Sequence, residues 1–255
     1  MVATRQSHQQ DKSADFSTRL ELLALTKDKR ELLIKANTLC AALPDQHQQI
    51  MAMEMVEILV EMNLDSETLA TAYIAPYFLD DLVCIEKVTE VMGSHVGVLL
   101  TGVSQMATIS TLAHQGNGTV QVDNIRRMLL AMVEDVRAVV IKLAEQVCHL
   151  RELKDSSEEE RVIAAKETAD IFAPLANRLG IGQLKWELED LSFRYLHPDL
   201  YKSIAKQLDD KRLGREAYMA DMVEQVKTKL AEVGIKAEVY GRPKHIFSIY
   251  KKMAQ

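Results

Sequence analysis

Apolar residues recur at intervals of three and four from about residue 16 to residue 232, and this spacing constrains the fold most. Such intervals place apolar side chains on one face of a helix, whereas a strand needs strict alternation. The clearest examples are Met51, Met55, Ile58, Leu59 and Met62, and Ile125, Leu129, Met132, Val136, Leu143, Val147 and Leu150. With 10 Gly, 5 Pro and 5% aromatic residues, the sequence lacks the turns and cross-strand residues of a β-sandwich or barrel. We therefore expect an all-α fold.

Polar stretches divide this helical pattern into parts. The expected parts are residues 1–15, 16–155, 156–232 and 233–255. The first offers no apolar face and is expected to be disordered. In the second, the helix from Val122 to about Leu153 is apolar all round at its centre, so we expect it to be the buried spine of a multi-helix domain. Ser157 and Glu160 form a capping box that opens the third part, a helical linker region, and Pro174 is expected to kink its first helix.

The pattern changes only after Gly234. Residues 235–240 alternate between apolar and polar and predict a strand. A turn at Gly241-Arg242-Pro243 follows, and Ile246, Phe247, Tyr250 and Met253 then share one face of a short helix. An isolated strand cannot satisfy its backbone groups. We therefore expect residues 233–255 to be the first strand and helix of an α/β domain that this chain does not complete.

Residues 241–253 are basic in a chain whose net charge is −6. Phosphate is the expected target of such a local patch. The turn and the helix N-terminus are expected to direct backbone N–H groups toward an anion. Arg242 can bind two phosphate oxygens, Lys244, Lys251 and Lys252 supply point charges, and Ser248 can donate a hydroxyl hydrogen bond. His245 is open to two interpretations, a phosphate contact or a structural role, and a solvated basic helix face remains the alternative for the whole patch.

Several classes of protein are excluded by what the chain lacks. There is no apolar run near ~18 residues and no apolar stretch at the N-terminus, so we expect neither a membrane span nor a signal peptide. The odd number of cysteines, Cys40, Cys84 and Cys148, predicts buried free thiols in a reducing cytoplasm. The acidic balance argues against direct binding to DNA.

Three segments together resemble the RelA/SpoT family of (p)ppGpp enzymes. They are residues 126–145, residues 173–196 and residues 240–253, in order and with plausible spacing. The likeness extends from about residue 45 onward and looks nearest to the RelA branch of the family. The resemblance implies a helical HD-type domain that, in bifunctional members, hydrolyses ppGpp with Mn²⁺. It also implies a synthetase domain that moves a pyrophosphoryl group from ATP to GDP or GTP.

The resemblance also locates the hydrolase ligands of the family in this sequence. Met51 stands where the family has its first His, Ala75-Pro76 where it has the His-Asp pair, and Glu145 where it has the last Asp. Leu79-Asp80 stands for the Glu-Asp pair. Because no His occurs between His47 and His95, we expect a degenerate, inactive hydrolase domain that binds no Mn²⁺. Asp80-Asp81 is expected to be a solvated helix cap, and Cys148-His149 no metal pair, because adjacent helical residues face apart.

For the synthetase, the resemblance implies that residues 242–252 line the ATP side of a site whose Mg²⁺ ligands and guanine-stacking tyrosine lie further along the family's chain. The ribosome would be contacted through C-terminal domains that are absent here. We therefore expect an isolated chain without cofactor or activity, the N-terminal part of a GTP pyrophosphokinase of the stringent response. The alternative is a regulatory module that acts on a synthetase domain in cis, and an active hydrolase with unusual ligands is disfavoured.

Overall fold

The computed structural model describes residues 15–41, 43, 46–113, 134–210, 212–241 and 244–254. Within these ranges the chain is helical and contains no strand, as the all-α prediction requires. The first helices are α1 (Phe16–Leu22), α2 (Lys27–Cys40), α3 (Gln46–Glu61), α4 (Ser66–Leu79), α5 (Ile85–Met92), α6 (Ser94–Ala113) and α8 (Val136–Glu152). The later ones are α9 (Glu158–Glu167), α10 (Ala173–Arg178), α11 (Gly182–Leu196), α12 (Pro198–Asp210), α13 (Arg212–Glu232) and α14 (Ile246–Met253). None of the helices in these ranges is both long and apolar enough to cross a membrane.

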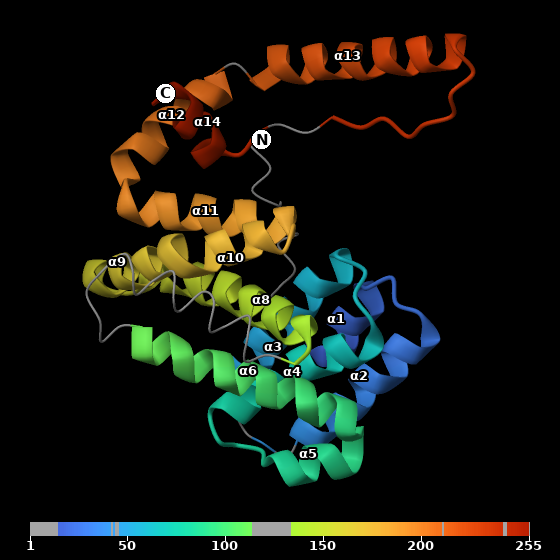
Figure 1. Ribbon diagram of the computed structural model, residues 1–255, viewed down its shortest axis with the longest axis vertical. Helices are drawn as coiled ribbons and strands as arrows, with labels where there is room; N and C mark the ends of the chain where they lie inside the picture. The colour runs from blue at the N-terminus through green and yellow to red at the C-terminus, as the bar shows by residue number, and fades with distance from the viewer. Residues whose placement is uncertain are drawn as a thin grey trace.

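One hydrophobic core joins the helices from α1 to α11 (Figure 1). α4 packs against α2, α3 and α6, and α8 packs against α3, α4 and α6. Every residue from Ala138 to Ala144 in α8 is buried, which confirms a buried spine over the described part of this helix. Residues 114–133, where we predicted a loop and the first turns of the same helix, lie outside the described residues.

Local capping signals in the sequence set several helix boundaries. Asp65 accepts a hydrogen bond from the Thr68 N–H at 3.0 Å and starts α4. Ser157 and Glu160 form the predicted capping box at the start of α9. These side chains satisfy N–H groups that have no partner inside their own helix.

Pro76 and Pro174 have different effects on the helices around them. α4 continues past Pro76 to Leu79, so Pro76 does not end it. Before Pro174 the chain forms a π-helical segment, Thr168–Phe172, rather than a simple kink. Pro174 has no N–H to offer the Asp170 carbonyl. The wider turn is held by Thr168, whose hydroxyl donates to the Ala164 carbonyl at 2.8 Å and accepts from Gln146 Nε2 at 2.9 Å.

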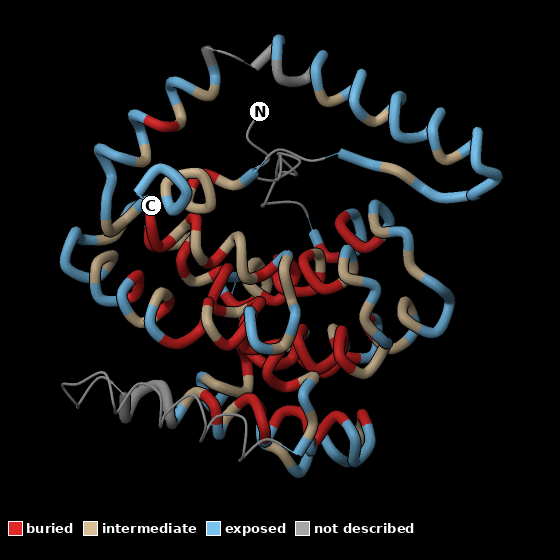
Figure 2. Tube along the Cα trace, turned by 45° about the horizontal axis from the view of Figure 1, so that its top comes forward, coloured by how far each residue is buried: buried red, intermediate tan, exposed pale blue. Residues whose placement is uncertain are grey.

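A second, smaller core lies where α11, α12 and α14 meet. Its buried members are Phe193, Ile204 and Ile246. Figure 1 shows α12 and α14 beyond the far side of α11, away from the first bundle. α13 stands apart from both cores, and its trace in Figure 2 is almost wholly exposed.

The strand predicted for residues 235–240 is not formed. These residues run back along α13 without pairing to a strand (Figure 1), because the described chain supplies no second strand. At the end of this segment a Cβ on Gly241 would lie 2.6 Å from Met219 Cγ. A glycine is therefore needed for the chain to pass this close to α13.

Candidate functional site

The hydrolase-type positions fall on three helices that meet in the core. α3 carries Met51, α4 carries Ala75 and Pro76, and α8 carries Glu145. These helices pack against one another, and Ala75 is fully buried between its neighbours. The architecture that would assemble a ligand set is therefore present, but three of these four side chains are apolar.

Glu145 is the one carboxylate at these positions, and it is paired with a lysine. Its Oε2 lies 2.5 Å from Lys142 Nζ, and the two side chains retain only 16% and 8% of their exposure. Among the described residues no group of three or more His, Cys, Asp and Glu could hold a metal ion. A methionine thioether and an alanine methyl group do not suit Mn²⁺, which prefers carboxylate and imidazole ligands. The residues present do not fit this metal.

The other sequence features near these positions have structural roles. Asp80 is the exposed C-cap of α4 and accepts a hydrogen bond from Gln48, and Asp81 is exposed with φ +56°. Burial raises the pKa of Cys148 well above the ordinary thiol range and raises that of Cys40 to about 12. The prediction that all three thiols are buried is wrong for Cys84, which is exposed before α5. It lies outside the regular helix that the sequence pattern suggested.

The basic C-terminal helix is held on α11 by a single carboxylate. Asp190 Oδ1 accepts from the Phe247 N–H at 2.8 Å, and Oδ2 accepts from the Ile246 N–H at 3.3 Å. His245 Nδ1 lies 3.3 Å from the same Oδ2, and its ring stacks on Trp186 at 5.5 Å. Asp190 is only 5% exposed. His245 therefore has a structural setting, one of the two interpretations left open by the sequence.

This arrangement corrects the expectation that the helix N-terminus faces a ligand phosphate. The first N–H groups of α14 do point toward an anion, but that anion is Asp190. A carboxylate is favoured there because the helix dipole places partial positive charge at this end. Sequence reasoning missed Asp190 and Trp186. The available signal was an acid at Asp190 on the same helical face as Trp186 and Phe193.

The structure separates the predicted phosphate contacts into two groups. Ser248 and Lys252 are four residues apart and share a side of α14, and Lys244 lies two residues before the helix begins. Lys244 and Lys252 are exposed, and contact with the Lys252 side chain and repulsion from its charge lower the pKa of Lys244. Lys251 instead lies over the Phe247 ring, 5.6 Å from its centre. Arg242 lies outside the described residues.

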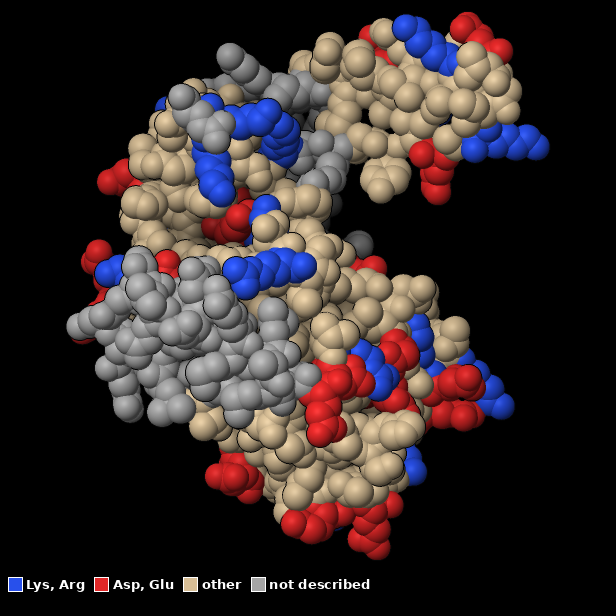
Figure 3. Space-filling view, viewed as in Figure 1, with Lys and Arg blue, Asp and Glu red and all other residues tan. Residues whose placement is uncertain are grey.

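The two exposed ammonium groups make this a local positive site. A phosphate between them would relieve their mutual repulsion. In Figure 3, Lys and Arg side chains gather at the upper left, where Figure 1 places α14. We name Ser248 and Lys252 of α14, together with Lys244 just before it, the basic face of α14.

α11 is also tied to the first bundle. Arg151 of α8 donates from Nη1 to Glu54 Oε1 of α3 at 2.6 Å and from Nη2 to Glu187 of α11. The Tyr195 hydroxyl donates to the Leu150 carbonyl at 2.8 Å. α11 therefore contacts the bundle through Glu187 and Tyr195 and contacts α14 through Asp190.

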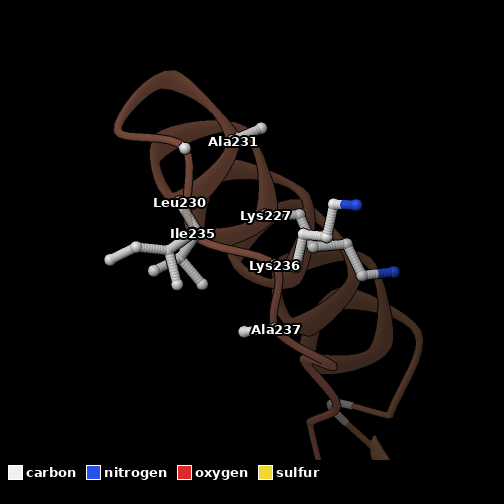
Figure 4. Close-up of a pocket in the computed structure, with 7 residues that line it drawn as sticks. Lys227, Leu230, Ala231, Ile235, Lys236 and Ala237 are labelled. Carbon is white, nitrogen blue, oxygen red and sulfur yellow. The ribbon is translucent and has the colours of Figure 1, made fainter.

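A hollow at the end of α13 has no catalytic side chains among its lining residues. It is an open hollow of about 480 Å³ at the turn between α13 and the extended segment. Figure 4 shows Lys227 and Lys236 extending away from Leu230 and Ile235, which also line it. Its lining includes no acid and no nucleophile, so it does not make a catalytic site.

Comparison with known proteins agrees with this architecture. The family model described as "HD domain" matches residues 44–182, which includes α3 through α10. This range contains all of the hydrolase-type positions.

Relatives with assigned names match over most of the chain. A GTP pyrophosphokinase of Escherichia coli strain K12 is 47% identical over 99% of the chain and 35% of its own length. One from Haemophilus influenzae is 48% identical over 99% of the chain and 36% of its own length. A probable guanosine-3′,5′-bis(diphosphate) 3′-pyrophosphohydrolase of Synechocystis is 39% identical over 77% of the chain and 26% of its own length. The chain thus spans about a third of the length of the first two relatives. It belongs to the HD domain family and, within it, to the RelA/SpoT family.

Proposed function

We propose that this chain forms the helical part of a GTP pyrophosphokinase and contributes the first phosphate-binding element of its ATP site. The observation that carries the proposal is the basic face of α14, where Lys244 and Lys252 are both exposed in a chain 47% identical to a named GTP pyrophosphokinase. Their charges bind and orient the triphosphate of ATP. The proposed reaction transfers the pyrophosphoryl group of ATP to the 3′-hydroxyl of GDP or GTP and releases AMP.

Further parts of the reaction are assigned outside this chain. Phosphoryl transfer requires Mg²⁺ held by carboxylates and a means of activating the acceptor hydroxyl. Among the described residues no cluster of His, Cys, Asp and Glu could hold a metal ion, and Asp190 is engaged by α14 itself. We place these groups, the guanine site and any ribosome contact in the part of the relatives that this chain does not span. The isolated chain therefore binds ATP weakly and makes no ppGpp.

Binding and turnover test these two statements separately. Equilibrium titration with ATP should show at least about tenfold weaker binding for Lys252→Ala than for the natural chain, the effect of one lost charge-assisted contact. Lys229→Ala, an exposed lysine on α13, is the matched control and should bind as the natural chain does. Equal affinities for both variants would refute the basic face. Any ppGpp formed from labelled ATP and GDP with Mg²⁺ would refute the assignment of catalysis to other segments.

The HD-type domain is proposed to be inactive as a hydrolase. Met51, Ala75 and Pro76 supply no Mn²⁺ ligand, and Glu145 is paired with Lys142. Incubation with ppGpp and Mn²⁺ should leave the nucleotide intact. Loss of ppGpp that depends on Mn²⁺ would show that another ligand set operates.

A second candidate role is regulation of the synthetase reaction by this domain. It is favoured by α11, whose two sides contact the bundle through Arg151 and α14 through Asp190. The rate or the nucleotide affinity of a separately prepared synthetase domain should change when this chain is added to it. An unchanged rate and affinity would remove this role.

A further inference from the structure

We propose that Asp190 is a positioning residue, whose carboxylate acts as a built-in anion that fixes α14 on α11 and closes the helix N-terminus to other anions. The identity of the ligand, the triphosphate of ATP, rests on the proposed function above. The docking itself is a property of the described residues. Asp190 lies 55 to 57 positions before the groups that it accepts from, so this contact is a tertiary one.

The surroundings of Asp190 present several polar groups to its carboxylate oxygens. It is 5% exposed and faces two backbone N–H groups and one imidazole nitrogen. A buried carboxylate is retained only where hydrogen bonds or opposite charge compensate for lost hydration, and here the helix dipole adds to three polar contacts. Ile246 is 2% exposed, so its N–H would be left buried without a partner if Asp190 were removed.

Apolar contacts then fix the rotation of α14. Ile246 enters the small core, and Tyr250 stacks on Phe193 with ring centres 4.7 Å apart. Both residues lie on other sides of α14 than the basic face. Asp190 contacts the N-terminus of α14, and Phe193 contacts its middle. Together these two residues of α11 direct Lys244 and Lys252 to solvent.

The consequence for nucleotide binding is specific. Phosphate oxygens cannot use the N–H groups of Ile246 and Phe247 while Asp190 holds them. The triphosphate therefore binds along the side of α14, at Lys244, Ser248 and Lys252. Asp190 contributes to affinity without touching the ligand.

Trp186 reports on this joint directly. It is the chain's single tryptophan, and its ring stacks on His245. We would prepare Asp190→Ala, Asp190→Asn and the control Asp209→Asn, which removes the same charge from an exposed position on α12. Asp190→Ala should shift Trp186 emission to longer wavelength and speed amide exchange at Ile246 and Phe247 by at least about tenfold. Asp190→Asn keeps one acceptor oxygen, so its Trp186 emission and amide exchange should lie between those of the natural chain and Asp190→Ala. The control should match the natural chain.

Chemical rescue separates a carboxylate acceptor from simple packing. Formate added to Asp190→Ala should restore the natural Trp186 emission and slow amide exchange again, because the small anion can occupy the vacated site. It should leave the natural chain unchanged. Trp186 emission and amide exchange that are unchanged in Asp190→Ala would overturn the inference. Changes in both that formate does not reverse would also overturn it.

ATP titration of the same variants distinguishes this inference from the proposed function. If ATP binds the natural chain and binds Asp190→Ala at least about tenfold more weakly, with recovery in formate, both hold. If docking depends on Asp190 but the natural chain binds no ATP, the positioning role holds and the proposed ligand is wrong. If ATP binds the natural chain and Asp190→Ala equally, Asp190 does not position the basic face.

Discussion

Replacing Arg151 by methionine should weaken the contact between the first bundle and α11 more than any surface change. Arg151 joins Glu54 of α3 and Glu187 of α11, and the three side chains keep 22%, 8% and 19% of their exposure. Methionine retains much of the apolar volume but removes the cation that joins these two carboxylates. The change therefore isolates the ion pairs from the packing.

The magnitude follows from burial. Removing one partner of a buried ion pair costs about 3–5 kcal/mol, and we expect the lower end, about 3 kcal/mol, because Arg151 keeps some contact with water. For a chain of this size each kcal/mol lowers Tm by about 2–4 °C, so Tm should fall by about 6–12 °C. Burial opposes the charge of Arg151, but Glu187 and Glu54 outweigh it and raise its pKa, so the guanidinium stays charged throughout the assay.

Urea unfolding followed by far-ultraviolet circular dichroism measures the cost. Arg178→Met, at an exposed arginine in α10, is the control and should change the free energy of unfolding by no more than about 0.5 kcal/mol. Combining Arg151→Met with Glu54→Gln should recover part of the loss, since one of the two carboxylates that Arg151 joined becomes a neutral amide. A cost below about 1 kcal/mol for Arg151→Met, or no recovery in the double variant, would refute this account.

Three further predictions concern groups outside that cluster. Hydrogen bonds from Arg137 lower the pKa of Asp135. A carboxyl whose pKa is lowered in the folded state contributes stability above about pH 4, and this contribution is lost as the pH falls through that lowered pKa. The free energy of unfolding in urea should therefore fall less steeply below about pH 4 in Arg137→Met than in the natural chain. An unchanged acid limb would contradict this. Gln146→Leu should lower the free energy of unfolding by about 1–3 kcal/mol, because the buried Thr168 hydroxyl loses one hydrogen-bond partner. In urea titrations, Gln146→Leu combined with Thr168→Val should cost less than the sum of the two single changes, and full additivity would contradict the coupling. Ellman's reagent should label Cys84 quickly in the native chain and all three cysteines in urea, because Cys40 and Cys148 are buried; rapid native labelling of Cys40 would contradict this.

Features encoded locally were predictable from the sequence. The apolar spacing of α3 and α8 and the capping box at Ser157 each depend on residues within one or two turns. In such cases the physical cause and the sequence signal lie in the same short window.

Features that depend on distant partners were not predictable in the same way. Residues 235–240 have the alternation of a strand but no described strand beside them. The N-terminus of α14 was expected to face a ligand, and the carboxylate that occupies it comes from α11. At the start of the π-helical segment before Pro174, the Thr168 hydroxyl accepts a hydrogen bond from Gln146 of α8. These outcomes depend on tertiary contacts, which periodicity does not encode.

The most direct test of the account is an ATP titration of the chain followed by amide NMR spectra. We predict that the signals of Lys244, Ser248 and Lys252 shift with added ATP, while those of Met51, Ala75 and Glu145 remain in place. Lys252→Ala should remove most of the shift. Absence of any change at α14, or a shift at the hydrolase-type positions instead, would contradict the proposal that this chain contributes a phosphate-binding face beside an inactive HD-type domain.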